Sequence, residues 1–553
     1  MAQHASDYQF RPHERPFMPG SPATPEHPML RRLGYAAIGV LIALTGGLSN
    51  GLLIANLPQI QGALGITSVE GGWLTAAYSM TNLCSGFLLI KARQQFGLQQ
   101  ITRIFLLGFV ALTGLQVLSH SYGTELILRA AAGIIAAGFT PLGFFYIMQS
   151  MSAKARLSGM VIGVGLSQVA LPLSRIISPF LLVHGDIQNL YIFEFALALM
   201  CLGAIALLRL PPSERAKVFE PLDFLTFGLV APGFALLAAV LVQGRIVWWT
   251  TPWLGYALAG AILLIGTAML IEHNRANPLL NTRWMGSAAI LRFAAIAAVM
   301  RLLLGEQNFG SAGLLTVAGM GPDQLITFYA IMTLATLGGL GASLWLLNPQ
   351  DLLRPIVFSV MLIVAAAFMD ADASNLTRPA NLYLTQAMIA FAATLFLGST
   401  LMAGILKAIS QGPAHMVSFS AVFSISQTIG GLGGAALLGS LQIMRERFHS
   451  NELVQQIVMT NPQVAARIQQ LGGAYARVVA DPVLRQAQGS RLLAQQITRE
   501  ANILAFNDVF MVVGVLASVA LIWLGGRWIY LRINKINPFA EDLAALQRMM
   551  ANR

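Results

Sequence analysis

The sequence predicts an all-α, polytopic membrane protein with about fourteen transmembrane helices. Hydrophobic residues make up 56% of the 553-residue chain and charged residues only 10%, and the mean hydropathy is +0.67. A soluble fold does not need so much apolar surface, whereas a chain that crosses a bilayer many times does. Segments of about 20 apolar residues, separated by short polar turns, recur to the end of the chain, and this is the length that crosses the hydrocarbon core as a helix.

The expected spans also predict an orientation. They run roughly over 34–56, 72–90, 104–121, 124–148, 158–182, 191–209, 223–243, 253–271, 288–309, 325–347, 355–370, 381–406, 416–440 and 506–530. Fourteen spans place both termini on one side of the membrane. Lys and Arg mark the cytoplasmic loops, and Arg31, Arg32, Lys91, Arg93 and Arg275 all flank spans on that side. Both termini are therefore expected in the cytoplasm.

Charge and cysteine content exclude other classes of protein. The chain has 34 Lys and Arg against 23 Asp and Glu, a net charge of +11. The basic residues mostly flank apolar segments, so they indicate topology and contacts with anionic lipid rather than binding of nucleic acid. Cys84 and Cys201 both lie within apolar segments and indicate neither a disulfide framework nor a metal site. Residues 1–32 are largely polar and Pro-rich and are expected to form a disordered cytoplasmic tail rather than a cleaved signal peptide.

One connection is unusually long. Residues 441–504 are polar and rich in Gln and Arg, and three helical runs are expected there, broken near Asn461-Pro462, Gly472-Gly473 and Asp481-Pro482. The connection lies on the outer side. It is either a solvated spacer or, as for many long loops, a functional segment, here a docking surface for a periplasmic partner.

The stretch Thr124 to Met148 contains an intramembrane charge. Arg129 lies a few residues inside this apolar span, and charged residues at membrane depth are costly and usually functional. Gly133, Ala137 and Pro141 recur at every fourth residue and form a face of small side chains that a neighbouring helix can approach closely. Arg129 either extends to the headgroups or faces a polar cavity inside the helical bundle.

The ninth span contains two further charges. Glu306 follows an apolar run and precedes Gln307 and Asn308, a polar triplet that indicates a cavity wall or the outer mouth. Arg301 lies five residues earlier, about 140° around a helix, so the two charges do not share a face. Each is expected to find its partner on another helix, unless Gly305 interrupts the winding. The alternative is that Glu306 lies among the outer headgroups.

Other polar residues could face a substrate. Arg175 lies in the middle of its span and is expected to face a cavity. Gln168, Asn82 and Gln427 are further candidates for hydrogen bonds to substrate, although polar residues within spans often only join helices. Glu194 begins the sixth span and is expected at the membrane interface.

Several motifs resemble those of a known family. The sequence Arg129-Ala-Ala-Ala-Gly133, taken with the fourteen-helix pattern, resembles the fourth-helix signature of the major facilitator superfamily, in particular its fourteen-helix drug:proton antiporter branch of the EmrB/QacA type. Residues 54–80 resemble the end of the first helix, the following loop and the second helix. Residues 424–442, 445–457 and 500–510 resemble the last two helices and the long loop between them.

This resemblance implies an architecture. It is two six-helix bundles, at 33–210 and 286–530, joined by a linker with two inserted helices at 211–285. The second bundle includes the 441–504 loop, and residues 531–553 form a cytoplasmic tail. The two bundles are expected to rock about a midplane site.

The resemblance also implies a function. It is secondary active transport across a bacterial inner membrane, exporting drug-like amphipathic small molecules by proton antiport, with anions favoured because buried arginines outnumber buried acids. Glu306 and Arg129 are assigned to proton coupling. The substrate-binding residues assigned are Arg175, Arg301, Gln168, Asn82 and Gln427. The expected partners are substrate, protons, lipid, a periplasmic membrane-fusion adaptor and an outer-membrane channel, with no cofactor and no metal.

The sequence departs from the family pattern at three places, one of which is the fifth-helix antiporter motif, where residues 170–180 read ALPLSRIISPF and the usual glycines are lost. The first helix of the family usually carries an aspartate about nine residues before its Leu-Pro, where this chain has Ser49. The loop between the second and third helices lacks the usual Gly-x-x-x-Asp-Arg-x-Gly pattern and reads IKARQQFG over 90–97. These losses leave an alternative, a transport-deficient sensor or scaffold of the same fold. An enzyme is not expected, because the chain has no His-Glu-x-x-His, Gly-x-Ser-x-Gly or Walker-type motif.

Overall fold

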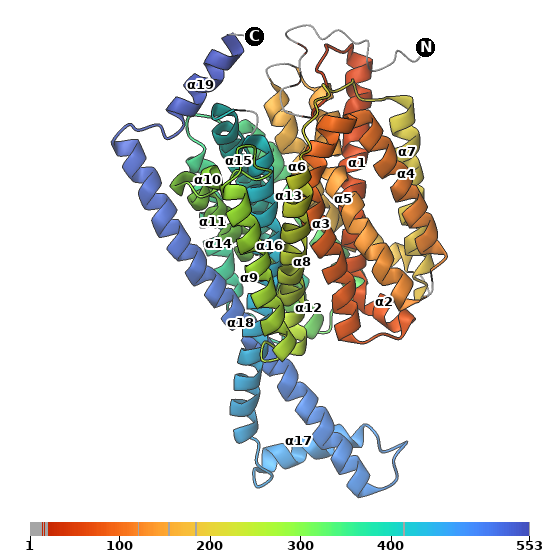
Figure 1. Cartoon of the computed structure of the whole chain (residues 1–553). Coiled ribbons are helices and arrows are strands. Elements are labelled where there is room, and N and C mark those ends of the chain that lie inside the picture. Colours follow the sequence, from red (N-terminus) through yellow and green to blue (C-terminus); the bar gives the residue numbers. More distant parts are fainter. Residues whose placement is uncertain are drawn as a thin grey trace.

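The computed structural model describes residues 14, 16, 20–119, 121–152, 155–182, 185–412 and 415–551. Throughout these residues the chain is helical, with one isolated β-bridge and no strand (Figure 1). Thirteen helices in this part of the chain are long and apolar enough to cross a membrane. A fourteenth, α3 (Ser68–Phe96), is more polar, but its 29 residues rise about 44 Å, more than a bilayer core requires.

The elements follow one another with short connections. Their bounds are α1 (Met29–Ala55), α2 (Leu57–Leu64), α3 (Ser68–Phe96), α4 (Leu98–Val117), α5 (Tyr122–Ser150), α6 (Arg156–Leu181), α7 (Gln188–Leu207), α8 (Pro221–Val247), α9 (Pro252–His273), α10 (Thr282–Met285), α11 (Ala288–Leu303), η4 (Glu306–Ser311), α12 (Ala312–Val317), η5 (Pro322–Leu325), α13 (Ile326–Trp345), α14 (Leu353–Asp370), η6 (Pro379–Leu382), α15 (Tyr383–Ser410), α16 (His415–Gln455), α17 (Pro462–Gly473), α18 (Pro482–Ile533) and α19 (Ala540–Ala551).

The transmembrane helices form two bundles of six. In the first bundle α1 packs against α5 and α6, α3 against α5, and α4 against α7. In the second, α13 packs against α15, α14 against α15 and α18, and α16 against α11 and α18. The bundles meet where α6 contacts α13 and α15. The start of α1 and the end of α18 lie at the same end of the molecule (Figure 1), which we call the N-terminal end.

The small-residue face of α5 lies against α3, as the sequence predicts. A side chain on Gly133 would collide with the backbone of α3 at Tyr78. Thr81 Oγ1 donates a hydrogen bond to Ala130 O at 2.7 Å, and Asn82 Nδ2 donates one to Gly133 O at 3.2 Å. Two backbones can therefore approach closely and share polar contacts inside the first bundle.

The segment before α1 differs from the disorder expected for residues 1–32. Ala23 N donates a hydrogen bond to Pro212 O at 2.9 Å, and Gln149 Nε2 donates one to Ala23 O at 2.8 Å. Ala23 and Thr24 are buried. This part of the tail is ordered because its backbone groups find partners on the first bundle and on the connection after α7. The residues of the tail that precede Gly20, except Glu14 and Pro16, lie outside the described residues.

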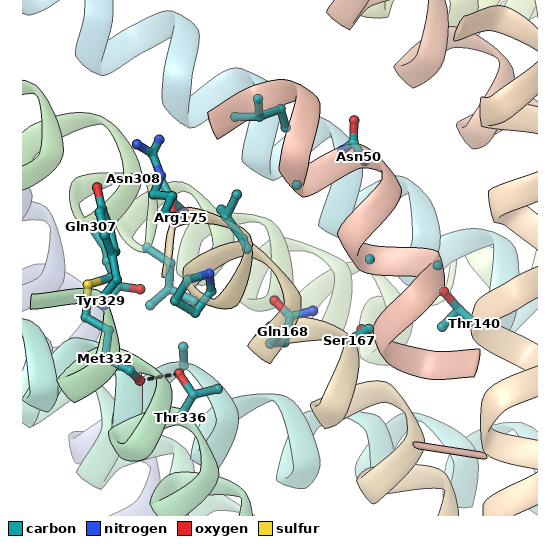
Figure 2. Close-up of a pocket in the computed structure, with 18 of the residues that line it drawn as sticks. Asn50, Thr140, Ser167, Gln168, Arg175, Gln307, Asn308, Tyr329, Met332 and Thr336 are labelled. Carbon is teal, nitrogen blue, oxygen red and sulfur yellow. Dashed lines mark hydrogen bonds between the residues drawn. The ribbon is translucent and has the colours of Figure 1, made fainter. Parts of the chain in front are cut away.

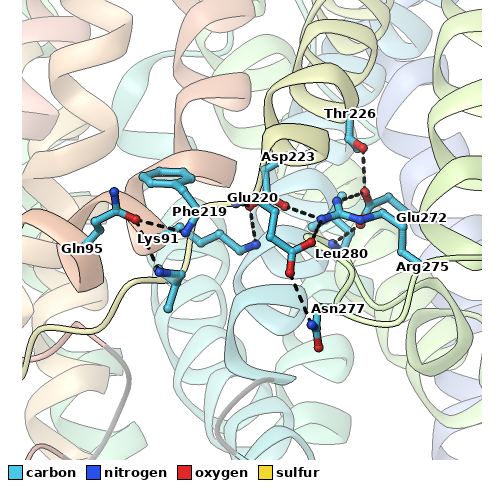
Figure 3. Close-up of polar contacts among 11 residues, drawn as sticks. Lys91, Gln95, Phe219, Glu220, Asp223, Thr226, Glu272, Arg275, Asn277 and Leu280 are labelled. Carbon is cyan, nitrogen blue, oxygen red and sulfur yellow. Dashed lines mark hydrogen bonds and ion pairs between the residues drawn. The ribbon is translucent and has the colours of Figure 1, made fainter.

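The inserted helices α8 and α9 are fastened to the first bundle by an ion-pair network (Figure 3). Lys91 Nζ of α3 lies 2.7 Å from Asp223 Oδ2 of α8. Arg275, just after α9, contacts Asp223 at 3.0 Å, Glu272 at 2.6 Å and Glu220 at 2.8 Å. The hydrogen bond from Arg275 holds the pKa of the exposed Glu220 below its usual value. Lys91 and Arg275 therefore form ion pairs within the protein, in addition to their expected role as signals of membrane topology. α8 also packs against α16, so the inserted pair lies beside both bundles.

The connection at 441–504 extends the bundle instead of forming a separate loop. The end of α16 and the beginning of α18 project together beyond the bundle, with α17 at their tip (Figure 1). The helices break at Asn461-Pro462 and Asp481-Pro482, as predicted, and Asn461 and Asp481 cap the following helices through their side chains. Gly489 of α18 has no room for a side chain against Ile468 O of α17, so α17 is held firmly on α18.

A hydrophobic cluster closes the space between the bundles at the N-terminal end. It joins residues of the first bundle, including Ile38 and Met148, to residues of the second, including Phe293, Ile405 and Phe419. These lie early on α1, α11 and α16 and late on α5 and α15. Any central cavity is therefore sealed from this end by packed apolar side chains.

Candidate functional site

A polar cavity of about 290 Å³ lies between the two bundles (Figure 2). Helices α1, α3, α5 and α6 provide one wall, and α11, η4, α13 and α15 the other. Gly46, Gly47 and Gly51 of α1 also line the cavity, and their lack of side chains lets α1 pack closely against α5 and α6. No aspartate or glutamate is among the described residues that line it. A cavity at the interface of two bundles is where transporters of repeated architecture bind substrate.

Two arginines face this cavity, as the sequence predicts. The guanidinium of Arg175 in α6 lies 5.2 Å from the ring centre of Tyr329 in α13, a cation–π contact across the bundle interface. Arg301 Nη1 in α11 donates a long hydrogen bond, 3.4 Å, to Gln168 Oε1 in α6. Neither arginine has an ion-pair partner in the described part of the chain. The cavity therefore presents two positive charges that remain uncompensated.

Two of the three amide side chains that were expected to bind substrate line the cavity, and one does not. Asn82 and Gln168 line the cavity, and Figure 2 shows Gln168 on α6 among the lining side chains. Gln427 in α16 does not line it, although its Nε2 is buried and without a hydrogen-bond partner. The structure also adds residues that the sequence analysis did not single out, among them Asn50, Thr140 and Tyr329. Their hydroxyl and amide groups offer neutral hydrogen bonds beside the two guanidinium groups.

Glu306 lies directly behind the cavity wall. Its side chain is fully buried and is not among the residues that line the cavity, so the alternative position among the outer headgroups is wrong. Gln386 Nε2 of α15 donates to Glu306 Oε1 at 3.0 Å and also to Asp370 Oδ2 of α14 at 2.8 Å. Glu306 Oε2 is buried with no partner. Two carboxyl groups are thus bridged by one amide, with no cation paired to either among the described residues.

Glu306 and the cavity-lining residues Gln307 and Asn308 lie in one π-helical turn and face different sides of it. η4 begins at Glu306, directly after Gly305, and such turns are often found at functional sites. Gln307 and Asn308 line the cavity, while Glu306 faces the interior of the second bundle. Gln307 Nε2 donates to the backbone O of Gln386 at 3.1 Å. Gln307 and Asn308 therefore form part of the cavity wall, as expected. Glu306 instead belongs to a separate acid cluster behind that wall.

Arg129 lies in a second enclosed cluster, so neither the headgroup position nor the cavity position expected for it is correct. Its side chain is 1% exposed, and its Nε donates to Glu125 Oε1, one turn earlier on α5, at 3.1 Å. Its Nη1 donates to Ser49 O of α1 at 3.3 Å. Glu194 of α7, expected at the interface, is also buried, and its Oε2 accepts from Ser49 Oγ at 3.4 Å.

Comparison with known proteins places the chain in a family. The family model described as Major Facilitator Superfamily matches residues 39–436. The Multidrug export protein EmrB of Haemophilus influenzae is 23% identical over 512 residues, covering 88% of this chain and 96% of that protein. The Probable actinorhodin transporter of Streptomyces coelicolor is 28% identical over 269 residues, covering 46% of this chain and 44% of that protein.

A solved structure confirms the fold. The human organic anion transporter MFSD10 (TETRAN) superposes with a TM-score of 0.53 at 15% identity, covering 89% of this chain and all of that chain. At this identity the likeness concerns the arrangement of helices alone. Together with the family match and the two bundles around a cavity, it shows that this multi-pass membrane protein belongs to the Major Facilitator Superfamily of transporters, as a divergent relative of its drug-export branch.

Proposed function

We propose that the chain is an inner-membrane secondary transporter that exports amphipathic, anionic small molecules in exchange for protons. The observation that carries this proposal is the central cavity. It presents the guanidinium groups of Arg175 and Arg301 with no acid among its described lining residues. Its volume lies near the lower end of the range of about 300–1,000 Å³ typical of small-molecule sites, and Tyr78 and Met332 supply apolar surface beside the charges.

The expected orientation places the cavity in an outward-facing arrangement, which is compatible with export. The flanking Lys and Arg residues favour a cytoplasmic position for both termini. The N-terminal end, sealed by the hydrophobic cluster, then faces the cytoplasm, and the cavity lies toward the periplasmic half. A transporter that exports substrate passes through this arrangement when it releases its cargo outward.

Proton coupling is assigned to the acid pair behind the cavity, with Glu306 as the carrier. Two ionised carboxylates bridged by one neutral amide, buried and without a cation, would be too costly. The pair therefore retains a proton. Gln307 connects the pair to the cavity, because its side chain lines the cavity and binds the backbone of Gln386, whose amide bridges the two acids. A substrate that displaces Gln307 changes the surroundings of the acid pair. Arg129 is assigned to proton coupling in the first bundle, where it interacts with the acids of its own cluster.

A reconstituted system tests this function. In liposomes containing the purified protein, an inside-acid pH gradient is expected to drive uptake of fluorescein, an amphipathic organic anion. Ethidium, a cation of similar size, is expected to remain outside, because the cavity holds two positive charges. Dissipating the gradient should return fluorescein uptake to the level of protein-free liposomes. Binding of fluorescein without gradient-driven uptake would instead favour the transport-deficient sensor or scaffold.

We assign the binding of a periplasmic adaptor to the extension built from α16, α17 and α18. The adaptor in turn contacts an outer-membrane channel. Gly489 holds α17 on α18, so the tip presents a fixed surface. Val478 and Val483, at 83% and 73% exposure, lie beside it. We take these exposed apolar side chains, at the tip of the projecting extension, as part of the surface that the adaptor would cover.

Crosslinking in cells tests the adaptor assignment. A photo-crosslinking residue at Val478 is expected to give a discrete adduct with a periplasmic protein of the membrane-fusion type. Deletion of residues 472–488 should abolish adducts formed from position 454, which remains in the deleted chain and is 54% exposed. The same probe at Ile533, 74% exposed at the opposite end, is the control and should give none. Undiminished adducts after the deletion would exclude this docking site.

A further inference from the structure

We propose that Glu194 of α7 is a second proton-carrying residue, located in the first bundle on the other side of the cavity from Glu306. This inference rests on the proposed proton exchange and extends it from one bundle to both. It is carried by the surroundings of Glu194, which are those of a buried acid whose charge is incompletely compensated.

The carboxyl of Glu194 is poorly satisfied for a buried group. Its side chain is 2% exposed. Oε2 accepts one long hydrogen bond, 3.4 Å, from Ser49 Oγ, and Oε1 has no partner. Arg129 faces the same group and also keeps one nitrogen, Nη2, without a partner. A buried ionised carboxylate normally accepts several strong hydrogen bonds or a direct ion pair, and Glu194 has neither.

The charges in this cluster do not cancel. Glu125 accepts from Arg129 Nε at 3.1 Å and from Gln116 Nε2 of α4 at 3.0 Å, so it takes the ion pair with the one guanidinium that the described residues place in this cluster. The other titratable side chains that face Glu194 among the described residues are Tyr191 of α7 and Tyr78 of α3, and both are neutral at physiological pH. Two carboxyl groups thus share one positive charge. A proton on Glu194, the acid with the weaker partners, removes the surplus.

This arrangement compensates for the missing acid in α1. Ser49 occupies the position where the family usually has an aspartate, and its hydroxyl instead holds a carboxyl that arrives from α7. Asn50, the next residue, lines the cavity and has a buried Oδ1 without a partner. Tyr78 lines the cavity as well and faces both Arg129 and Glu194. The proton site therefore adjoins the cavity through Tyr78, although the acid itself comes from a different helix.

Infrared difference spectroscopy on the purified full-length protein tests this proposal without any substrate. The spectrum is recorded over a pH titration, and protonated buried carboxyl groups are followed by their C=O stretch. The wild type is expected to show titrating carboxyl bands from both bundles. Glu194→Gln should remove one band and leave the band that Glu306→Gln removes. Glu194→Asp should restore a band at a shifted frequency.

A second variant separates a proton carrier from a merely structural residue. Ser49→Ala deletes the one hydrogen bond that a described residue donates to the Glu194 carboxyl, so it should shift the frequency of the Glu194 band without abolishing it. A spectrum of Glu194→Gln that keeps every carboxyl band of the wild type would overturn the proposal. So would a Glu194 band that does not change over the titration. If both variants behave as expected and fluorescein is still not moved by a pH gradient, the antiport function fails while the proton site stands.

Discussion

Replacing Glu306 by glutamine is expected to remove the proton movement that the second bundle couples to substrate, while leaving substrate exchange intact. Glutamine keeps the size of the side chain and its contact with Gln386, but it cannot release a proton. In proteoliposomes with a pH-sensitive dye inside, fluorescein added under a concentration gradient should drive proton flux in the wild type. The variant should lose the part of this flux that Glu306 carries, and any flux that remains above that of protein-free liposomes is assigned to Glu194. Exchange of labelled for unlabelled fluorescein should continue, because Glu306 does not line the cavity.

The neighbouring acid and a distant one provide the comparisons. Asp370→Asn should reduce coupled proton flux in the same way, because Asp370 and Glu306 are bridged by Gln386. Glu452→Gln, in the exposed part of α16 beyond the bundle, should leave the flux unchanged. Proton flux that persists undiminished in Glu306→Gln would exclude this residue as the carrier and move the coupling to the cluster around Arg129.

Replacing Arg175 by alanine is expected to weaken binding of organic anions by roughly thirtyfold, which corresponds to about 2 kcal/mol. The guanidinium is one of the two uncompensated positive charges of the cavity, and its contact with Tyr329 holds it there. Titration calorimetry with fluorescein measures the affinity directly. Arg301→Ala should act in the same direction, and the double variant should bind anions and neutral analogues about equally.

A third arginine of the same region is the matched control. Arg292 lies on the same helix as Arg301, is exposed at the N-terminal end, and donates only to the backbone of the preceding turn. Arg292→Ala should therefore leave anion affinity unchanged. Equal affinity for fluorescein in the wild type and in Arg175→Ala would remove the argument for an anionic substrate.

Sequence reasoning identified the fold and the cavity because both follow from patterns along the chain. The lengths of the apolar segments predicted the membrane spans, and Pro and Gly predicted the breaks between helices in the extension. Arg175 was recognised because a charge in the middle of an apolar span has no route to the headgroups. Arg301 and Glu306 were correctly separated, because five residues of helix place them on different faces. Asn82 and Gln168 were found for the same reason as Arg175, since polar side chains in such spans need a polar neighbour.

The partners of these residues could be read from the sequence only in part. Glu125 is four residues before Arg129, a spacing that predicts an ion pair on one face of a helix, and this signal was overlooked. Asp370 ends its span and Gln386 begins the next, so a helical hairpin brings them together, but Asp370 resembled an ordinary polar helix end. The contact of Glu194 with Ser49 joins residues 145 positions apart, and no local pattern reveals it. Gln427 illustrates the reverse error, because the sequence does not show which way its helix is turned.

The continuity of α18 has a mechanical consequence. Its 52 residues make an uninterrupted rod about 78 Å long. One end carries α17 at the tip, and farther along Phe506 and Phe510 fit against Gly313 and Gly310, beside the turn that bears Glu306. A partner bound at the tip is thus connected, through one continuous helix, to the π-helical turn that contains Glu306. Under the proposed function, a partner bound to the extension outside the bilayer acts through α18 on when Glu306 binds and releases its proton.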